Sequence, residues 1–319
     1  MRRQRGIRHL DKVDQRLCEL LLADPRSSNR ALAEAIDMTD ETVATRLRTL
    51  REDGVLATTV VVDWRKAGYS HQAVARVRVT GRTFSEVVRP LVGHPSVLAL
   101  TEVSGVCDGV VHLLATDAEA LQEFATEVLR PLDGVVGVDL SLAVRELKYP
   151  TTKLTLPIPS WDPSELPAPA LQLDAVDEDL VRELALDGHQ SYSELGRRLA
   201  VSDATIRRRV QRLEDSGLFS IVAAIDPVAT GDVTSIAFAF LDVAGPLAEL
   251  EKAVADLPAV ISATACVGSR DAVLVLGATE GGLTRMASVE LASLPGVVGT
   301  DVAYANDVIH HRSHLVSLG

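Results

Sequence analysis

The chain has 319 residues, a formal net charge of −12 at pH 7 and 47% hydrophobic residues. No apolar run reaches membrane-spanning length and the basic start leads into a polar helix, so we expect a cytoplasmic protein. The cysteines Cys18, Cys107 and Cys266 fit no metal-ligand spacing, and the sequence predicts neither a metal nor a cofactor. The acidic balance does not exclude nucleic acid, because binding needs only a local basic surface.

Residues 1–68 predict three short helices, at 11–23, 29–36 and 40–53, followed by a strand at 56–63. In the third helix Val43, Leu47 and Leu50 recur at helical spacing and should face a core. Three short helices of this kind indicate a helix-turn-helix domain. Its third helix offers polar and basic side chains, namely Thr42, Thr45, Arg46 and Arg48. The arginines of the N-terminal tail, Arg2, Arg3, Arg5 and Arg8, could follow phosphates or belong to a disordered terminus.

In residues 69–149 the sequence changes to segments in which apolar and polar residues alternate, a pattern typical of strands. The pattern predicts strands from residue 73 and at 97–103, 110–115 and 135–147, with helices at 84–91 and 117–129. The order βαββαβ is the ferredoxin-like arrangement. Gly105 and Asp108 lie in the turn between its two middle strands.

Residues 150–170 contain six of the fourteen prolines and predict a stiff, extended linker. Four apolar residues in and near it, Leu154, Leu156, Ile158 and Trp161, suggest that the linker packs partly on a domain.

Residues 171–231 predict a second helix-turn-helix domain whose third helix, 202–218, is rich in arginine. Ser202 is a good N-cap, and Ile206, Val210 and Leu213 should face inward. A short basic helix suits the major groove of DNA, although a solvated surface helix has the same pattern. The candidate DNA contacts are Ser202, Thr205, Arg207, Arg208, Arg209 and Arg212. Residues 232–319 then predict a second βαββαβ domain, with strands at 236–243, 260–267, 272–278 and 297–309 and helices at 247–257 and 283–293.

The two halves match each other residue by residue. Placing Leu10 on Leu173 gives an offset of 163 that holds without a gap as far as Gly68 on Gly231. Such a register indicates an internal duplication. The copies are unequal, because the stretch 202–218 has four arginines against three carboxylates, whereas 39–55 has three arginines against four.

The motif set resembles the Lrp/AsnC family of transcription regulators. The resemblance rests on LDKVD and LDAVD, on TVATRLRTLREDGVL and TIRRRVQRLEDSGLF, and on GVCDGV and GSRDAV, and it covers nearly the whole chain twice. It implies an α+β protein in which two helix-turn-helix domains alternate with two ferredoxin-like effector domains. The first third helix departs from the family's Arg-Val-x-Arg-Leu-Glu run, which the second keeps at 209–214.

The resemblance further implies double-stranded DNA and a small, amino-acid-like effector as partners, and a homo-oligomer of chains. Effector residues carried over in this way are Gly105, Asp108, Gly268, Arg270 and Asp271. The alternative is that each glycine makes a tight turn and each aspartate caps it. Arg270 beside Asp271 could hold both ends of a zwitterion, so we expect the second turn to bind an effector more tightly. We also expect the two effector domains to pair within one chain.

The sequence is compatible with two other functions. Siroheme decarboxylases resemble the same two-domain unit, but the histidines here do not recur between halves, and the sequence predicts no catalytic residue and no enzyme activity. A ligand-binding scaffold with weakened DNA binding would fit the acidic first helix-turn-helix.

Overall fold

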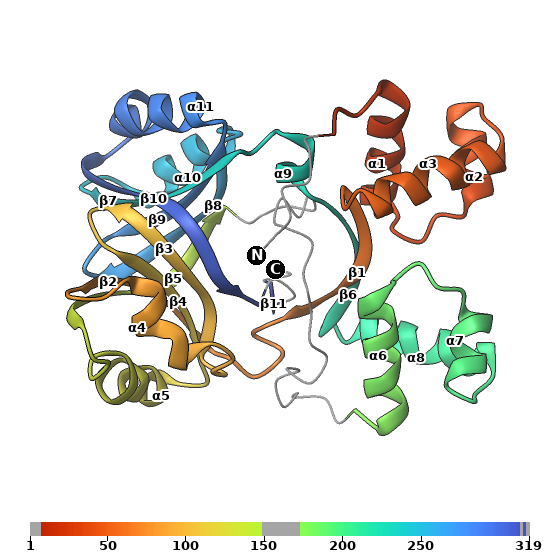
Figure 1. Ribbon diagram of the computed structural model, residues 1–319, viewed down its shortest axis with the longest axis horizontal. Coiled ribbons are helices and arrows are strands. Elements are labelled where there is room, and N and C mark those ends of the chain that lie inside the picture. The colour runs from red at the N-terminus through yellow and green to blue at the C-terminus, as the bar shows by residue number, and fades with distance from the viewer. Residues whose placement is uncertain (1–7, 149–172, 313–314, 317–319) are drawn as a thin grey trace. The chain divides into compact units, whose positions relative to one another are not determined.

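The structure is a computed structural model that describes residues 8–148, 173–312 and 315–316 (Figure 1). The described chain forms two compact units. The head unit contains residues 8–68, 173–232 and 315–316, and the sheet unit contains residues 69–148 and 233–312. Most of the N-terminal tail and the proline-rich linker lie outside the described residues. In the described parts of the chain, no helix combines the length and apolarity that a membrane crossing requires.

The head unit holds two helix-turn-helix heads of the same construction. The first head contains α1 (Lys12–Ala23), α2 (Asn29–Ile36), α3 (Asp40–Glu52) and β1 (Leu56–Asp63). The second contains α6 (Ala175–Leu186), α7 (Tyr192–Arg198), α8 (Asp203–Asp215), β6 (Phe219–Ile225) and α9 (Pro227–Thr230). The predicted helices are confirmed, and each is preceded by an N-cap whose side chain accepts from the first turn, namely Asp11, Ser28, Thr39, Asp174, Ser191 and Ser202.

Strand pairing joins the heads. β1 runs antiparallel to β6 from Leu56↔Ile225 to Val62↔Phe219, and β11 (Leu315–Val316) adds to β1 in parallel. The core of the first head is therefore shared: α1, α2 and α3 bury Leu17, Leu47 and other residues against Ala223 of β6. Neither this pairing nor β11 is evident from the sequence pattern.

The sheet unit contains the βαββαβ order twice, as predicted. The first copy has β2 (His71–Val79), α4 (Phe84–Val88), β3 (Val97–Gly105), β4 (Gly109–Ala115), α5 (Ala118–Glu123) and β5 (Val135–Lys148). The second has β7 (Ser235–Val243), α10 (Leu247–Ala255), β8 (Val260–Gly268), β9 (Ala272–Ala278), α11 (Glu280–Arg285) and β10 (Val297–His311). The second helix of each copy continues as a π-helical segment, Phe124–Leu129 in the first and Met286–Glu290 in the second, where a single regular helix was predicted.

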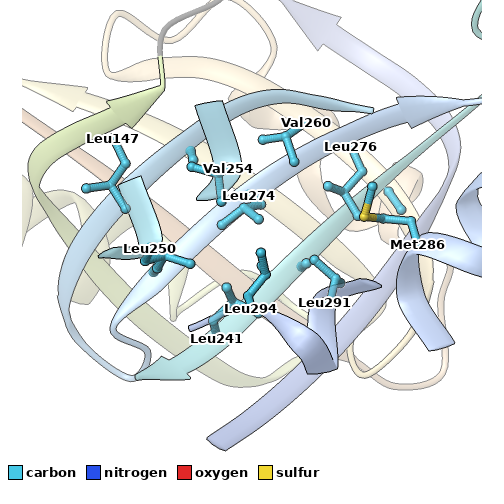
Figure 2. Packing of buried hydrophobic residues seen from close by; sticks show 14 of the residues in the cluster. Leu147, Leu241, Leu250, Val254, Val260, Leu274, Leu276, Met286, Leu291 and Leu294 are labelled. Atoms are coloured by element: carbon cyan, nitrogen blue, oxygen red, sulfur yellow. The ribbon is translucent and has the colours of Figure 1, made fainter. Parts of the chain in front are cut away.

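The two copies close into one eight-stranded sheet, in the order β10-β3-β4-β2-β5-β8-β9-β7. The junctions are β5 with β8 and β10 with β3, so the expected pairing within one chain is confirmed. The long last strands cross over: Leu147 of β5 lies in the core of the second copy, as Figure 2 shows, and Ile309 of β10 packs on the core of the first. This exchange makes the two copies a single packing unit.

The other face of the sheet carries a third apolar cluster, which includes Val74, Cys107, Phe238, Phe240 and Cys266. Histidines join it. The ring of His112 on β4 stands edge-on to Phe238 with centroids 5.6 Å apart. Burial lowers the pKa of His112 to about 4, and burial together with neighbouring histidines lowers that of His311 to about 4. Both imidazoles are therefore neutral near pH 7.

This burial predicts acid sensitivity of the fold. The unfolded chain takes up these protons near the ordinary histidine pKa of about 6.5, whereas the folded chain does so only near pH 4, so stability falls as pH drops between these values. The loss is at most about 3 kcal/mol per histidine. Urea unfolding at pH 7 and pH 5 should show the loss and show less of it in His112→Leu. The exposed His9→Gln is the control, and a pH dependence unchanged by His112→Leu would contradict the assignment.

Candidate nucleic-acid interface and effector turns

The recognition helix of the second head, α8, separates its apolar and basic residues. Ser202 Oγ accepts from the Thr205 backbone N–H at 3.2 Å, while Ile206, Val210 and Leu213 are buried. Arg208 is exposed, and no ion pair or hydrogen bond to another described residue holds its guanidinium. Arg207 is also exposed and lies over the Tyr192 ring at 5.0 Å. These two guanidinium groups are available to an anionic partner.

Two other arginines of α8 are engaged inside the head. Arg209 Nη1 lies 2.7 Å from Asp174 Oδ2 and 2.7 Å from Asp177 Oδ1, and Arg212 Nη2 lies 2.5 Å from Asp177 Oδ2. The Arg209 hydrogen bond holds the pKa of Asp174 below its usual value. Arg212 keeps 55% of its side chain exposed, against 22% for Arg209. Arg209 thus fixes α8 to the start of α6, and the buried Asp177 on which it depends was not singled out in the sequence.

The first recognition helix, α3, repeats this arrangement with fewer free cations. Arg46 Nη1 lies 2.8 Å from both Asp11 and the buried Asp14, as its equivalent Arg209 does in the second head. Thr42 shares a hydrogen bond with the N-cap Thr39 at 2.9 Å. Thr45 and Arg48 are exposed. At the positions equivalent to Arg207 and Arg208, α3 carries Ala44 and Thr45, so the two heads present different chemistry.

The Gly-x-x-Asp turns lie where one copy of the fold meets the other. Gly105 has a φ of +127° and Gly268 one of +126°, and a Cβ at either position would lie 2.5 Å from a backbone oxygen of the opposite copy, Val302 or Leu140. Only glycine permits that approach. The close approach of the two copies therefore explains why glycine occupies both positions, without a bound ligand.

The turn aspartates also have backbone partners. Asp108 Oδ2 accepts from the Val79 N–H at 2.8 Å, and Asp271 Oδ2 accepts from the Val243 N–H at 2.8 Å. One oxygen of each carboxylate thus accepts from the last residue of a neighbouring strand. Both aspartates are exposed.

The side chains around the two turns differ. Arg270 forms ion pairs with Asp242 and Asp301 rather than lying against Asp271. Arg76 from β2 also reaches Asp301, at 2.9 Å, and is 3.5 Å from Asp139. At the first turn, Cys107 takes the place of Arg270, and burial raises the pKa of its thiol to about 11, which leaves it protonated and unreactive.

Comparisons with known proteins identify domains in both halves. A winged helix-turn-helix DNA-binding model matches residues 10–57, the Lrp/AsnC ligand binding domain matches 72–152, and the AsnC-type helix-turn-helix domain matches 173–214. The chain therefore contains regulator domains of the Lrp/AsnC type.

Some similar proteins match about half of the chain, and others match nearly all of it. The HTH-type transcriptional regulator FL11 of Pyrococcus horikoshii is 28% identical over 46% of this chain and 97% of its own length. The DNA-binding transcriptional activator DecR of Escherichia coli K12 is 29% identical over 45% and 97%. The crystal structure of the siroheme decarboxylase NirDL covers 97% of this chain and 95% of its own, with a TM-score of 0.63 and 14% identity, which shows a shared fold.

Proposed function

We propose that this chain is a sequence-specific DNA-binding transcriptional regulator, built by tandem duplication and acting in the cytoplasm as a homo-oligomer. The observation that carries the proposal is the exposed pair Arg207 and Arg208 on α8, which is free of carboxylate partners among the described residues. The matched domains and the names of FL11 and DecR support it.

Within the proposal the candidate DNA contacts divide into two groups. Arg208, Arg207 and Thr205 at the start of α8, with Arg212 as a partly exposed neighbour, would read bases or phosphates, as would Thr42, Thr45 and Arg48 on α3. Arg46 and Arg209 would instead hold the recognition helices against α1 and α6. A mobility-shift assay with the region upstream of the protein's own gene tests DNA binding. The absence of any sequence preference, in this assay and among random duplexes, would favour a scaffold role.

The proposed effector is an amino acid or a similar zwitterion that binds beside a Gly-x-x-Asp turn. The preference expected for the second turn depended on Arg270, whose guanidinium lies between Asp242 and Asp301. At the first turn Asp139 keeps 45% of its side chain exposed, and its ion pair with Arg76 is 3.5 Å long. An incoming ammonium group would find Asp108 and Asp139 with spare acceptor capacity, and on that ground we propose that the effector binds beside the first turn.

Asparagine variants test this placement better than alanine variants, because an amide oxygen can still accept from Val79 or Val243. We expect Asp108→Asn to weaken effector binding about tenfold, the scale of one charge-assisted hydrogen bond, and Asp271→Asn to change it less. Calorimetric titration with a panel of amino acids measures both, with the exposed Asp133→Asn as the control. The reverse order of effects would return the site to the second turn.

An enzyme acting on a tetrapyrrole is a second candidate, favoured by the half-buried, neutral imidazoles of His112 and His311 in the closed sheet and by the fold shared with a siroheme decarboxylase. Incubating the protein with siroheme and following the absorption spectrum separates the two functions. A spectral change that depends on His112 would favour the enzyme, and its absence alongside DNA binding would favour the regulator.

A further inference from the structure

Each head extends a turn residue into the other. Arg26, between α1 and α2, and His189, between α6 and α7, occupy equivalent positions in the repeat. Arg26 donates to the carbonyl oxygens of Gly188 at 3.0 Å and Gln190 at 2.8 Å. His189 Nε2 lies 3.1 Å from the carbonyl oxygen of Ser27. In each contact a side chain of one turn therefore bonds to backbone oxygens of the other turn. The positions of these acceptors do not depend on a side-chain rotamer.

An aromatic ring strengthens this contact on one side only. The guanidinium of Arg26 lies 4.3 Å from the centroid of the Tyr192 ring, and that of Arg207 lies 5.0 Å from the same centroid. Tyr192 thus links the turn of the first head to the recognition helix of the second. Its equivalent in the first head is Asn29, which has no ring.

The second head is also fixed to the strand of the first. Gly188 N–H donates to Thr58 O at 2.8 Å, and Thr59 Oγ1 donates to Ala185 O at 2.9 Å. At the position equivalent to Gly188 the first head has Pro25, which has no N–H, and at that of Thr59 the second half has Val222, which has no hydroxyl. The duplication has thus left the second head with anchors that the first head cannot form.

We propose that Arg26, seated on Gly188, Gln190 and Tyr192, is a brace that fixes the separation and angle of the two recognition helices. This inference rests on the proposed function. The brace then determines how many base pairs separate the two half-sites that the protein accepts, and Tyr192 positions Arg207 to contact the DNA. Arg26 and Tyr192 are positioning residues, because they act through α8 and through the turn that precedes α7.

Distance measurement between the recognition helices tests the brace without DNA. Glu41→Cys and Ala204→Cys place spin labels at equivalent exposed positions at the starts of α3 and α8, and the three native cysteines are buried. Double electron–electron resonance on the full chain, with labelled chains diluted into unlabelled protein so that only distances within one chain are measured, should give one narrow distance distribution. Arg26→Ala and Tyr192→Leu should broaden it at least twofold, while Arg30→Ala, which removes only an exposed pair with Glu34, should not. Unchanged widths in both brace variants would overturn the proposal.

The DNA experiment uses duplexes in which one, two or five base pairs are inserted between the half-sites. The parent protein should bind at least about tenfold more weakly to each of these duplexes, the scale on which one base-specific contact acts. Arg26→Ala should flatten this dependence, and a spacing profile identical to the parent's would contradict the proposal. A parent that binds no duplex would refute the proposed function, and the distance distributions would still decide whether the brace exists.

Discussion

Replacing Arg208 with alanine is expected to weaken specific DNA binding by about 1–3 kcal/mol, roughly 5- to 150-fold, which is the range for removing one base-specific interaction. The free energy of unfolding should stay unchanged, because the side chain is exposed and holds no other described residue. Fluorescence anisotropy with a labelled duplex measures the first quantity, and urea unfolding measures the second.

The matched control is Arg197→Ala, which removes another exposed arginine from α7, where its ion pair with Glu194 is 4.0 Å long. Adding Arg207→Ala to Arg208→Ala should also reduce the dependence of affinity on salt, by a slope of about 0.9 for each phosphate that the protein no longer neutralises. If affinity and salt slope are both unaltered in the double variant, α8 is not the DNA-reading helix.

Replacing Asp177 with alanine is expected to destabilise the second head by about 3 kcal/mol or more. The carboxylate is buried and accepts from both Arg209 and Arg212. It also accepts from the backbone N–H of the N-cap Asp174, which completes the capping box of α6. Its removal breaks the ion pairs that hold α8 to α6. The half-buried guanidinium of Arg209 then keeps Asp174 as its remaining carboxylate partner. Urea unfolding measures the effect, and DNA affinity should fall with it, because α8 loses its fixed place.

The comparison variant is Asp179→Ala, which removes an exposed partner of Arg182 from the same helix and should cost about 1 kcal/mol or less. Asp14→Ala should reproduce the Asp177 effect in the first head, since Asp14 holds Arg46 in the same way. Equal stability of Asp177→Ala and Asp179→Ala would show that the ion pairs contribute little to holding α8.

The sequence predicted those features that depend on local pattern. Helical spacing located α3 and α8, and strand alternation located β2 and the βαββαβ order. The offset between the halves predicted that both copies share one fold. The two periodic signals survive in a single sequence because each arises from residues close together in the chain, and the offset survives because both halves repeat the same local patterns.

Contacts between distant segments left weaker signals. Asp14 and Asp177 look like ordinary surface residues of acidic helix starts, and no sequence pattern predicted their burial. The position of Arg270 beside Asp271 suggested a pair, whereas the turn directs its guanidinium to Asp242 and Asp301. The contacts of Arg26 with Gly188 and Gln190 join residues more than 160 positions apart, and no local pattern records them.

Selection of bound fragments from genomic DNA tests whether α8 reads a specific DNA sequence. The full chain and the Arg207→Ala, Arg208→Ala double variant would be compared at the same salt concentration. We expect the parent to enrich fragments sharing an asymmetric site with two unlike half-sites, one for α3 and one for α8, and the double variant to lose the α8 half. No enrichment by the parent, or the same enriched fragments with both proteins, would contradict this expectation.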